Sequence, residues 1–334
     1  MQVLIVNQAE VARLLPMAEC VAVMQEALST LARGQALLPL RQVLMLPDGR
    51  GAFAAMPAHL SAPAAVGIKV ITVFPGNHGT EYDSHQGAVL LFETERGRLL
   101  AVMDASSITA IRTAAVSAVA TRALAREDAT TLALLGTGVQ AATHLEAMAL
   151  VRPLRRVRVW SRDPARVSAF VDRARARHGL EVQAAASARE AVQDADVVCT
   201  VTASRTPVLE GAWLRPGAHV NAVGASVRSA RELDTAAVVR ARLFVDRRES
   251  ALNEAGDFLI PRGEGAIADD HIRAELGEVL IGRAPGRGSA DEVTLFKSLG
   301  LAVEDVASAH RIHGNAQASG AGTWVELGGG RDAT

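Results

Sequence analysis

The sequence has few cysteines and almost no net charge, and each of these two shortages argues against a class of protein. Two cysteines among 334 residues, Cys20 and Cys199, argue against a disulfide framework and favour a reducing cytoplasm. A formal net charge of −1 argues against non-specific nucleic-acid binding. No run approaches the roughly 20 apolar residues of a membrane-spanning helix, and the first residues do not resemble a signal peptide. We therefore expect a cytoplasmic protein with neither nucleic-acid nor membrane partners.

The hydrophobic share of 49% in a chain of 334 residues is enough to build two domains. The first hundred residues combine a helical pattern at 16–33 with extended segments. Turn residues predict two hairpins, and a further strand is expected at 66–74. The hairpins pair 42–46 with 51–55 and 88–93 with 99–104. We expect an α+β domain with a largely antiparallel sheet.

A long Ala-rich helix is expected at 106–126, and the pattern of predicted secondary structure changes after it. Short apolar runs then alternate with helical patterns, and this alternation predicts a parallel, doubly wound sheet. The predicted strands are 131–135, 156–160, 182–185, 197–201, 219–223 and 243–246. Residues 263–288 are expected to form a helix-bearing connection, and a final helix is expected at 298–318. The fold class is therefore α/β, a Rossmann sheet plus an α+β domain.

A glycine-rich turn follows the first strand of this sheet. Residues 132–141 read LALLGTGVQA, a strand that enters a Gly-x-Gly-x-x-Ala turn before a helix. Gly136 permits the turn, Gly138 lets backbone approach a pyrophosphate, and Ala141 lets the helix pack closely on the strand. The alternative is an ordinary turn between a strand and a helix. The surrounding strands favour a dinucleotide site.

The end of the second strand distinguishes the two nicotinamide cofactors. An acid there binds the ribose of NAD, whereas an arginine suits the 2′-phosphate of NADP. Ser161 and Arg162 occupy this place and can both bind a phosphate. Asp163 and Pro164 are interpreted as the start of the next helix. The sequence favours NADPH over NADH, although Arg162 could also be an ordinary surface arginine.

Three isolated cations in apolar surroundings indicate a pocket for a carboxylate. Lys69 lies within GIKVITV, Arg112 within SITAIRTAAV, and Arg41 begins the first hairpin. Burying such charges without a partner is costly. The alternative is that each cation pairs with an internal acid such as Asp104. His85 could shuttle protons or contact the cofactor, or only cap backbone groups. No spacing resembles a metal site, so no metal is expected.

The order of several segments resembles the ornithine cyclodeaminase/mu-crystallin family over nearly the whole chain. The segments are KVITVF (69–74), SHQGAVLLFE (84–93), AVMDA (101–105), ITAIRTAAVSA (108–118), LGTGVQA (135–141), PGAHVNAVGA (216–225) and FKSLGLAVED (296–305). The resemblance implies a homodimer with a central Rossmann domain, 116–295, that binds the cofactor. Residues 1–115 with 296–334 would bind substrate and form the dimer contact.

The resemblance also implies roles for individual residues. The positions that match the carboxylate clamp are Arg41, Lys69 and Arg112, which we expect to be the catalytic group. The expected cofactor-binding residues are Ser84, His85, Arg112, Gly136, Thr137, Gly138, Val139, Gln140, Ser161, Arg162, Thr202, Val223 and Lys297. Asp257 is a further candidate near the cofactor, and both it and Lys297 could instead be structural.

Two positions separate branches of the family. Ornithine cyclodeaminases carry an aspartate where this chain has Ser226, and an acid where it has Ser161. A serine hydroxyl cannot replace a carboxylate base without assistance. Both departures resemble the mu-crystallin-like ketimine reductases. The implied activity is NADPH-dependent reduction of cyclic ketimine carboxylates such as Δ1-pyrroline-2-carboxylate or Δ1-piperideine-2-carboxylate to cyclic L-amino acids. The alternatives are an ornithine cyclodeaminase-type lyase, an alanine dehydrogenase-type enzyme and a non-catalytic NADPH-dependent binding protein.

Overall fold

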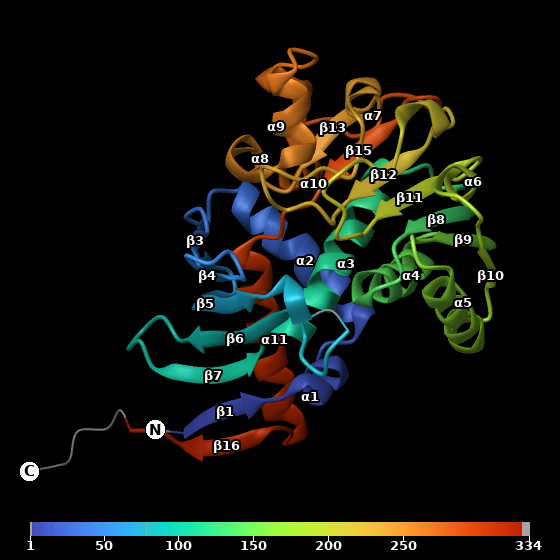
Figure 1. Cartoon of the computed structure of the whole chain (residues 1–334). Helices are drawn as coiled ribbons and strands as arrows, with labels where there is room; N and C mark the ends of the chain where they lie inside the picture. Colours follow the sequence, from blue (N-terminus) through green and yellow to red (C-terminus); the bar gives the residue numbers. More distant parts are fainter. Residues whose placement is uncertain (1, 78, 329–334) are drawn as a thin grey trace, which may run out of the picture. The chain divides into compact units, whose positions relative to one another are not determined.

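A computed structural model describes residues 2–77 and 79–328, and it divides the chain into two compact units (Figure 1). Unit 1 comprises Met1–Arg112 and Leu301–Thr334, and unit 2 comprises Thr113–Gly300. The domains predicted from the sequence, 1–115 with 296–334 and 116–295, include residues 1, 78 and 329–334, which lie outside the described residues. The α/β fold class predicted from the sequence is confirmed.

Unit 1 is an eight-stranded mixed sheet with helices packed on it. Its strands follow the order β16-β1-β7-β6-β5-β4-β2, and β3 pairs with β4. The strands are β1 (Gln2–Val6), β2 (Ala36–Leu37), β3 (Gln42–Met45), β4 (Ala52–Ser61), β5 (Ala64–Val73), β6 (His85–Phe92), β7 (Leu99–Asp104) and β16 (Thr323–Glu326). The helices are α1 (Gln8–Leu14), α2 (Met17–Ala32), η1 (Pro75–Asn77) and α11 (Ala302–Ser319).

Both predicted hairpins of unit 1 are confirmed, whereas β1 and β16, at one end of its sheet, were not predicted. β3 pairs with β4 and β6 with β7, each antiparallel as expected. β1 pairs in parallel with β7, and β16 pairs antiparallel with β1. The sequence analysis predicts no strand at the residues of β1 or β16. β16 returns the end of the chain to the first strand, so the pairing depends on contacts between distant residues.

Unit 2 is an eight-stranded, all-parallel sheet with the strand order β10-β9-β8-β11-β12-β15-β13-β14. Its strands are β8 (Thr131–Leu135), β9 (Arg156–Trp160), β10 (Glu181–Ala184), β11 (Val197–Thr200), β12 (His219–Ala222), β13 (Arg242–Val245), β14 (Ile272–Glu275) and β15 (Thr294–Lys297). Its helices are α4 (Val139–Val151), α5 (Pro164–His178), α6 (Ala188–Val192), η2 (Gly211–Trp213), α7 (Thr235–Arg240), α8 (Arg248–Glu254), α9 (Gly256–Gly263), η3 (Asp269–His271) and α10 (Leu276–Leu280). The helix α3 (Ala105–Leu124) starts in unit 1 and ends in unit 2.

The six strands predicted for this sheet are present within a residue or two, but two others were missed. Within the predicted connection 263–288, residues Ile272–Glu275 form β14. β15 lies between β12 and β13, and its four residues are fully buried. The final helix begins at Ala302 and not at residue 298, because Gly300 has a φ of +78°. That left-handed conformation interrupts a helix.

The apolar residues of α1 and α2 belong to the core of unit 1. Val11, Leu14, Val21, Met24 and Leu28 are all buried. Among the described residues, no single helix is long and apolar enough to cross a membrane. Helices α1 and α2 taken together are long and apolar enough, but they are bent by 78° relative to each other.

Candidate active site

The loop between β8 and α4 contains the glycines that the sequence predicts to bind a pyrophosphate. Gly136 has a φ of +127°, and a Cβ at this position would lie 2.6 Å from the Val201 carbonyl oxygen. Gly138 is the N-cap of α4, and a Cβ there would meet no heavy atom within 4 Å. Ala141 is fully buried where the helix meets the sheet. The loop therefore leaves an open cradle beside the positive end of a helix dipole.

Gln140, in the first turn of α4, has a side-chain oxygen without a hydrogen-bond partner among the described residues. This oxygen is also buried. A buried polar atom without a partner normally costs free energy. An amide oxygen only accepts hydrogen bonds, so this atom could pair only with a donor and not with a phosphate oxygen. The neighbouring Val139 is exposed, and Thr137 donates a hydrogen bond of 3.4 Å to Ser161.

The residues predicted to bind the cofactor ribose directly follow β9. Arg162 is exposed and Ser161 is half-buried. Asp163 caps α5 by accepting hydrogen bonds from the backbone of Ala165 and Arg166, and Pro164 is the first residue of that helix. This confirms the interpretation of Asp163 as a helix start. The capping bonds occupy one of its carboxylate oxygens, and the other lies 3.3 Å from the Arg166 guanidinium.

Three further predicted cofactor residues follow the carboxyl ends of central strands. Thr202 follows β11, Val223 follows β12, and Lys297 ends β15. Lys297 is 1% exposed, and its ammonium lies 3.0 Å from Asp257 and donates to the Ala222 carbonyl at 3.1 Å. Its charge is thus directed at groups of unit 2 itself.

Unit 1 contains a buried cluster of cations and carboxylates. Lys69, on β5, is 2% exposed, and its Nζ lies 2.7 Å from Asp305 Oδ2 and 3.4 Å from Thr109 Oγ1. Arg112, on α3, donates from Nε to Asp305 at 3.0 Å and from Nη1 to Glu304 at 2.8 Å. Both carboxylates are fully buried on α11. Two of the three predicted clamp residues therefore meet, and they share Asp305.

The packing of α11 on the sheet explains how these groups meet. Ala65, Gly67 and Lys69 alternate on the buried face of β5, as a strand period of two requires. A Cβ at Gly67 would lie 3.0 Å from the Val306 side chain, so α11 approaches this strand closely. Figure 1 shows α11 lying across β5, β6 and β7.

The charges of this cluster shift the pKa of Lys69. Burial lowers the pKa to about 8; Asp305 opposes the shift, and the positive charges of Arg112 and Arg41 reinforce it. Lys69 and Arg112 are balanced by the two carboxylates, and the half-buried Arg41 adds a positive charge that acts on Lys69 from outside the buried cluster. This additional charge can attract an anion, and a lysine with this pKa can donate a proton near neutrality.

The alternative that the cations pair with internal acids is correct for Lys69 and Arg112, but the predicted acid was wrong. Asp104 instead accepts a hydrogen bond from the Ser107 backbone at the start of α3. The sequence reasoning missed Glu304 and Asp305. Their signal was two adjacent acids within the apolar run LAVEDVASA.

The remaining predicted residues of unit 1 lie at the starts of two strands of its sheet. Arg41 is half-buried and directly precedes β3. Ser84 directly precedes β6, and its hydroxyl lies 3.2 Å from His85 Nδ1. His85 starts β6, one of the strands next to β5, and its carbonyl accepts a hydrogen bond from Ser106. His85 is thus within the strand rather than before it.

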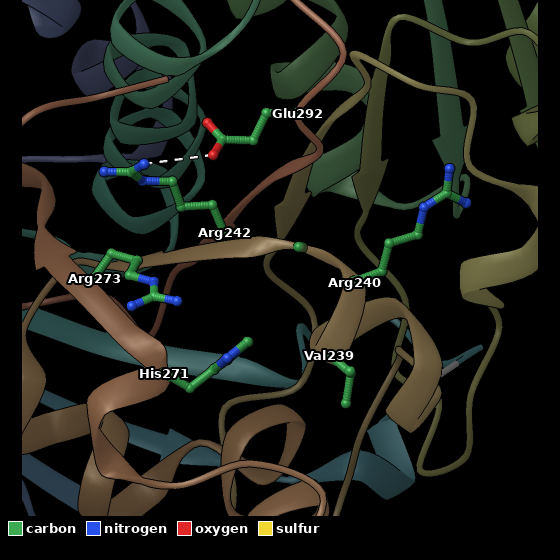
Figure 2. A pocket seen from close by; sticks show the side chains of 7 residues that line it. Val239, Arg240, Arg242, His271, Arg273 and Glu292 are labelled. Carbon is green, nitrogen blue, oxygen red and sulfur yellow. Dashed lines mark hydrogen bonds and ion pairs between the residues drawn. The ribbon is translucent and has the colours of Figure 1, made fainter. Parts of the chain in front are cut away.

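A separate cleft of about 320 Å³ lies at the opposite, amino edge of the unit 2 sheet. It is lined by Val239, Arg240, Ala241, Arg242, His271, Arg273 and Glu292. Figure 2 shows Arg242 and Arg273 on one side and Arg240 extending away. Arg242 lies 3.4 Å from Glu292, and Arg240 donates to two backbone carbonyls. The cleft contains no predicted cofactor or substrate residue.

Among the described residues, no group of His, Cys, Asp or Glu could hold a metal ion.

Comparisons with known proteins agree with this arrangement. Residues 1–320 match the model of the ornithine cyclodeaminase/mu-crystallin family. The chain is 42% identical over 280 residues to mouse (Mus musculus) ketimine reductase mu-crystallin, covering 84% of this chain and 85% of the mouse protein. It is 38% identical to Thermococcus litoralis Δ1-pyrroline-2-carboxylate reductase, solved with NADH and L-proline, at a TM-score of 0.94 and covering 96% and 99% of the two chains. An archaeal alanine dehydrogenase dimer with bound NAD is 33% identical, at a TM-score of 0.92 and covering 98% and 100%. The chain therefore belongs to the ornithine cyclodeaminase/mu-crystallin family, as the order of its sequence segments predicts.

Proposed function

We propose that this protein reduces the C=N bond of cyclic ketimines that carry a 2-carboxylate, using a reduced nicotinamide cofactor. The observation that carries the proposal is the buried, ion-paired cluster of Lys69 and Arg112, with the positive charge of Arg41 acting on it and a lowered lysine pKa. The ketimine reductase and pyrroline-2-carboxylate reductase relatives support it. Δ1-Pyrroline-2-carboxylate and Δ1-piperideine-2-carboxylate are the natural candidate substrates.

The cofactor would be held by unit 2. The open cradle at Gly138 and the first turn of α4 would bind the pyrophosphate. We propose NADPH over NADH, because Ser161 and Arg162 can bind a 2′-phosphate and no acid ends β9. The relatives solved with NADH or NAD support a nicotinamide cofactor in general. When bound, the reduced nicotinamide supplies the hydride.

The cationic cluster of unit 1 would bind the substrate and protonate it. Arg41 and Arg112 would hold the carboxylate, since guanidinium groups bind carboxylates with charge-assisted hydrogen bonds. Lys69 would donate a proton to the imine nitrogen, because an iminium accepts a hydride far more readily than a neutral imine. Asp305 would keep Lys69 protonated and fixed in direction. Alignment of the substrate with the cofactor can lower the activation free energy by several kcal/mol.

We further propose that the protein is a homodimer that associates through unit 1. The β3–β4 hairpin exposes Val43, Leu44, Met45 and Phe53, with 42% to 63% of each residue accessible. Exposed apolar groups gathered on one hairpin favour a protein partner. The dimeric alanine dehydrogenase relative supports this proposal.

The test is a cofactor-oxidation screen of cyclic imines with and without a carboxylate. We expect the carboxylated imines to be reduced with NADPH. Lys69→Ala should reduce turnover severely and leave NADPH binding nearly intact. Wild-type turnover in this variant would remove Lys69 from the mechanism.

A second candidate is reductive amination of pyruvate, because the archaeal alanine dehydrogenase has the same fold at 33% identity. Pyruvate with ammonia belongs in the same screen. Ornithine belongs there too: release of ammonia from ornithine without net NADPH oxidation would support a lyase despite Ser226. Tight NADPH binding without turnover of any imine would indicate a binding protein.

A further inference from the structure

Glu232, a buried acid that sequence reasoning did not select, joins the carboxyl ends of two central strands of unit 2. It is fully buried. Its Oε1 accepts hydrogen bonds from the Thr202 backbone N–H at 2.7 Å and from the Thr202 hydroxyl at 2.6 Å. Its Oε2 accepts from the Gly224 N–H at 2.7 Å and from the Thr200 hydroxyl at 2.8 Å. One carboxylate therefore connects the segment after β11 to the segment after β12.

Two other buried charges hold Glu232 in place. Asp257 Oδ1 accepts hydrogen bonds from the backbone N–H groups of Glu232 and Leu233, at 2.8 and 3.1 Å. The other oxygen of Asp257 is paired with Lys297. Lys297 in turn donates to the carbonyl of Ala222, the last residue of β12. The network thus fixes the ends of β11, β12 and β15 against one another.

The two joined segments approach closely, and a glycine makes this possible. A Cβ at Gly224 would lie 2.1 Å from the Thr202 carbonyl oxygen and 2.6 Å from Glu232 Oε1. No other residue fits without a shift of the backbone. The segments contain Thr202 and Val223, two of the predicted cofactor residues.

The hydrogen bonds require a carboxylate and not an amide. Each oxygen of Glu232 accepts one backbone N–H, from Thr202 on one side and Gly224 on the other. A glutamine presents one oxygen and one NH₂ group. In either orientation its NH₂ would oppose a backbone N–H that cannot rotate away. Glu232→Gln therefore separates the segments with almost no change in side-chain volume.

We propose that Glu232 is a positioning residue that shapes the carboxyl edge of this sheet for the nicotinamide half of the cofactor. In an open parallel sheet, ligands bind outside the carboxyl ends of the strands. The inference rests on the proposed function, since it assumes that unit 2 binds a dinucleotide. It adds a residue that contacts neither cofactor nor substrate and acts through Thr202 and Gly224.

The test compares Glu232→Gln with a matched change at the opposite edge of the same sheet. Asp196 directly precedes β11, is 5% exposed, and accepts hydrogen bonds from the backbone of Thr130 and Thr131. Asp196→Asn thus disturbs a buried carboxylate at the amino ends of the strands. The measurements are NADPH binding by fluorescence titration without imine, steady-state kinetics, and thermal unfolding.

We expect Glu232→Gln to raise the Kd for NADPH at least tenfold and to lower kcat, at a temperature where circular dichroism shows a folded protein. Asp196→Asn should lower the melting temperature and change the Kd less than twofold. If Glu232→Gln does not fold, Thr200→Val removes one hydroxyl donor and should raise the Kd about threefold. A wild-type Kd in the folded Glu232→Gln variant would overturn the inference. If Thr200→Val is used in its place, a wild-type Kd in that variant would overturn it. An equal rise in Kd in Asp196→Asn would also overturn it.

The two proposals fail in different ways. If the wild-type protein binds NADPH but reduces no imine, the proposed function fails, and the Kd comparison still decides the role of Glu232. If the wild-type protein binds no nicotinamide cofactor, both proposals are overturned.

Discussion

Replacing Asp305 with asparagine removes the charge that holds Lys69 protonated. Asp305 Oδ2 lies 2.7 Å from Lys69 Nζ, and its other oxygen accepts a hydrogen bond from Arg112. Asparagine keeps the size of the side chain but loses the negative charge. Burial and the charges of Arg112 and Arg41, which lower the Lys69 pKa, then act without opposition.

The expected effect on the pH profile can be estimated. An opposite charge within about 4–6 Å shifts a pKa by roughly 1–3 units. The pKa of Lys69, about 8 in the intact cluster, should therefore fall to roughly 5–7. Because the proton donor must be protonated, activity is lost as the pH rises through this pKa. At pH 7 a pKa of about 6 leaves roughly one tenth of the lysine protonated, so kcat should fall about tenfold.

The assay is NADPH oxidation with a saturating cyclic imine carboxylate between pH 5 and pH 9. Glu304→Gln is the matched control, because Glu304 pairs with Arg112 whereas Asp305 contacts Lys69 itself. Breaking a buried ion pair costs about 3–5 kcal/mol of stability, so both variants are measured well below their melting temperatures. The reasoning is refuted if the alkaline limb of Asp305→Asn coincides with that of the wild type.

Three further predictions concern unit 2. Gly138→Ala should weaken NADPH binding about tenfold without lowering the melting temperature, because a Cβ there meets no protein atom; a lower melting temperature with unchanged binding would contradict this. Arg162→Ala should lower the kcat/KM ratio of NADPH to NADH by roughly 10- to 100-fold, since a charged hydrogen bond contributes about 1.5–3 kcal/mol; an unchanged ratio would exclude a phosphate contact. Burial lowers the pKa of His144 from 6.5 to about 4, so between these values the unfolded chain binds a proton that the folded chain does not. Stability is therefore lost as the pH falls below about 6.5, by up to about 3 kcal/mol, and His144→Gln should flatten urea-unfolding stabilities measured from pH 4 to 7; an equally steep decline would disprove the assignment.

The strands and helices that the sequence predicted well are those with a local signal. The Gly136 turn, the Asp163–Pro164 helix start and the β3–β4 hairpin all combine turn residues with a clear hydrophobic period. β15 lacked such a signal, because its four residues are all buried and carry no alternation. A fully buried strand in a parallel sheet cannot be recognised from period alone. The equally buried β11 and β12 were predicted from their place in the alternation of strands and helices.

The candidate site was predictable in its cations but not in its carboxylates. Lys69 and Arg112 stand out because a charge inside an apolar strand or helix needs a partner. The partner of Arg112 lies 193 residues away, on α11. Only the packing of that helix on β5 determines which acid meets which cation. The same reasoning applies to Glu232, whose side-chain partners come from two segments that are separate in the sequence.

The most direct test of the central claim is the ratio of kcat/KM values for Δ1-piperideine-2-carboxylate and Δ1-piperideine with NADPH. The two imines share a ring and differ only in the carboxylate that the Lys69 cluster is proposed to bind. Two charge-assisted hydrogen bonds predict a preference of at least about 100-fold for the carboxylated imine. Equal values for the two imines would contradict the claim that the cations Arg41, Lys69 and Arg112 select an anionic substrate.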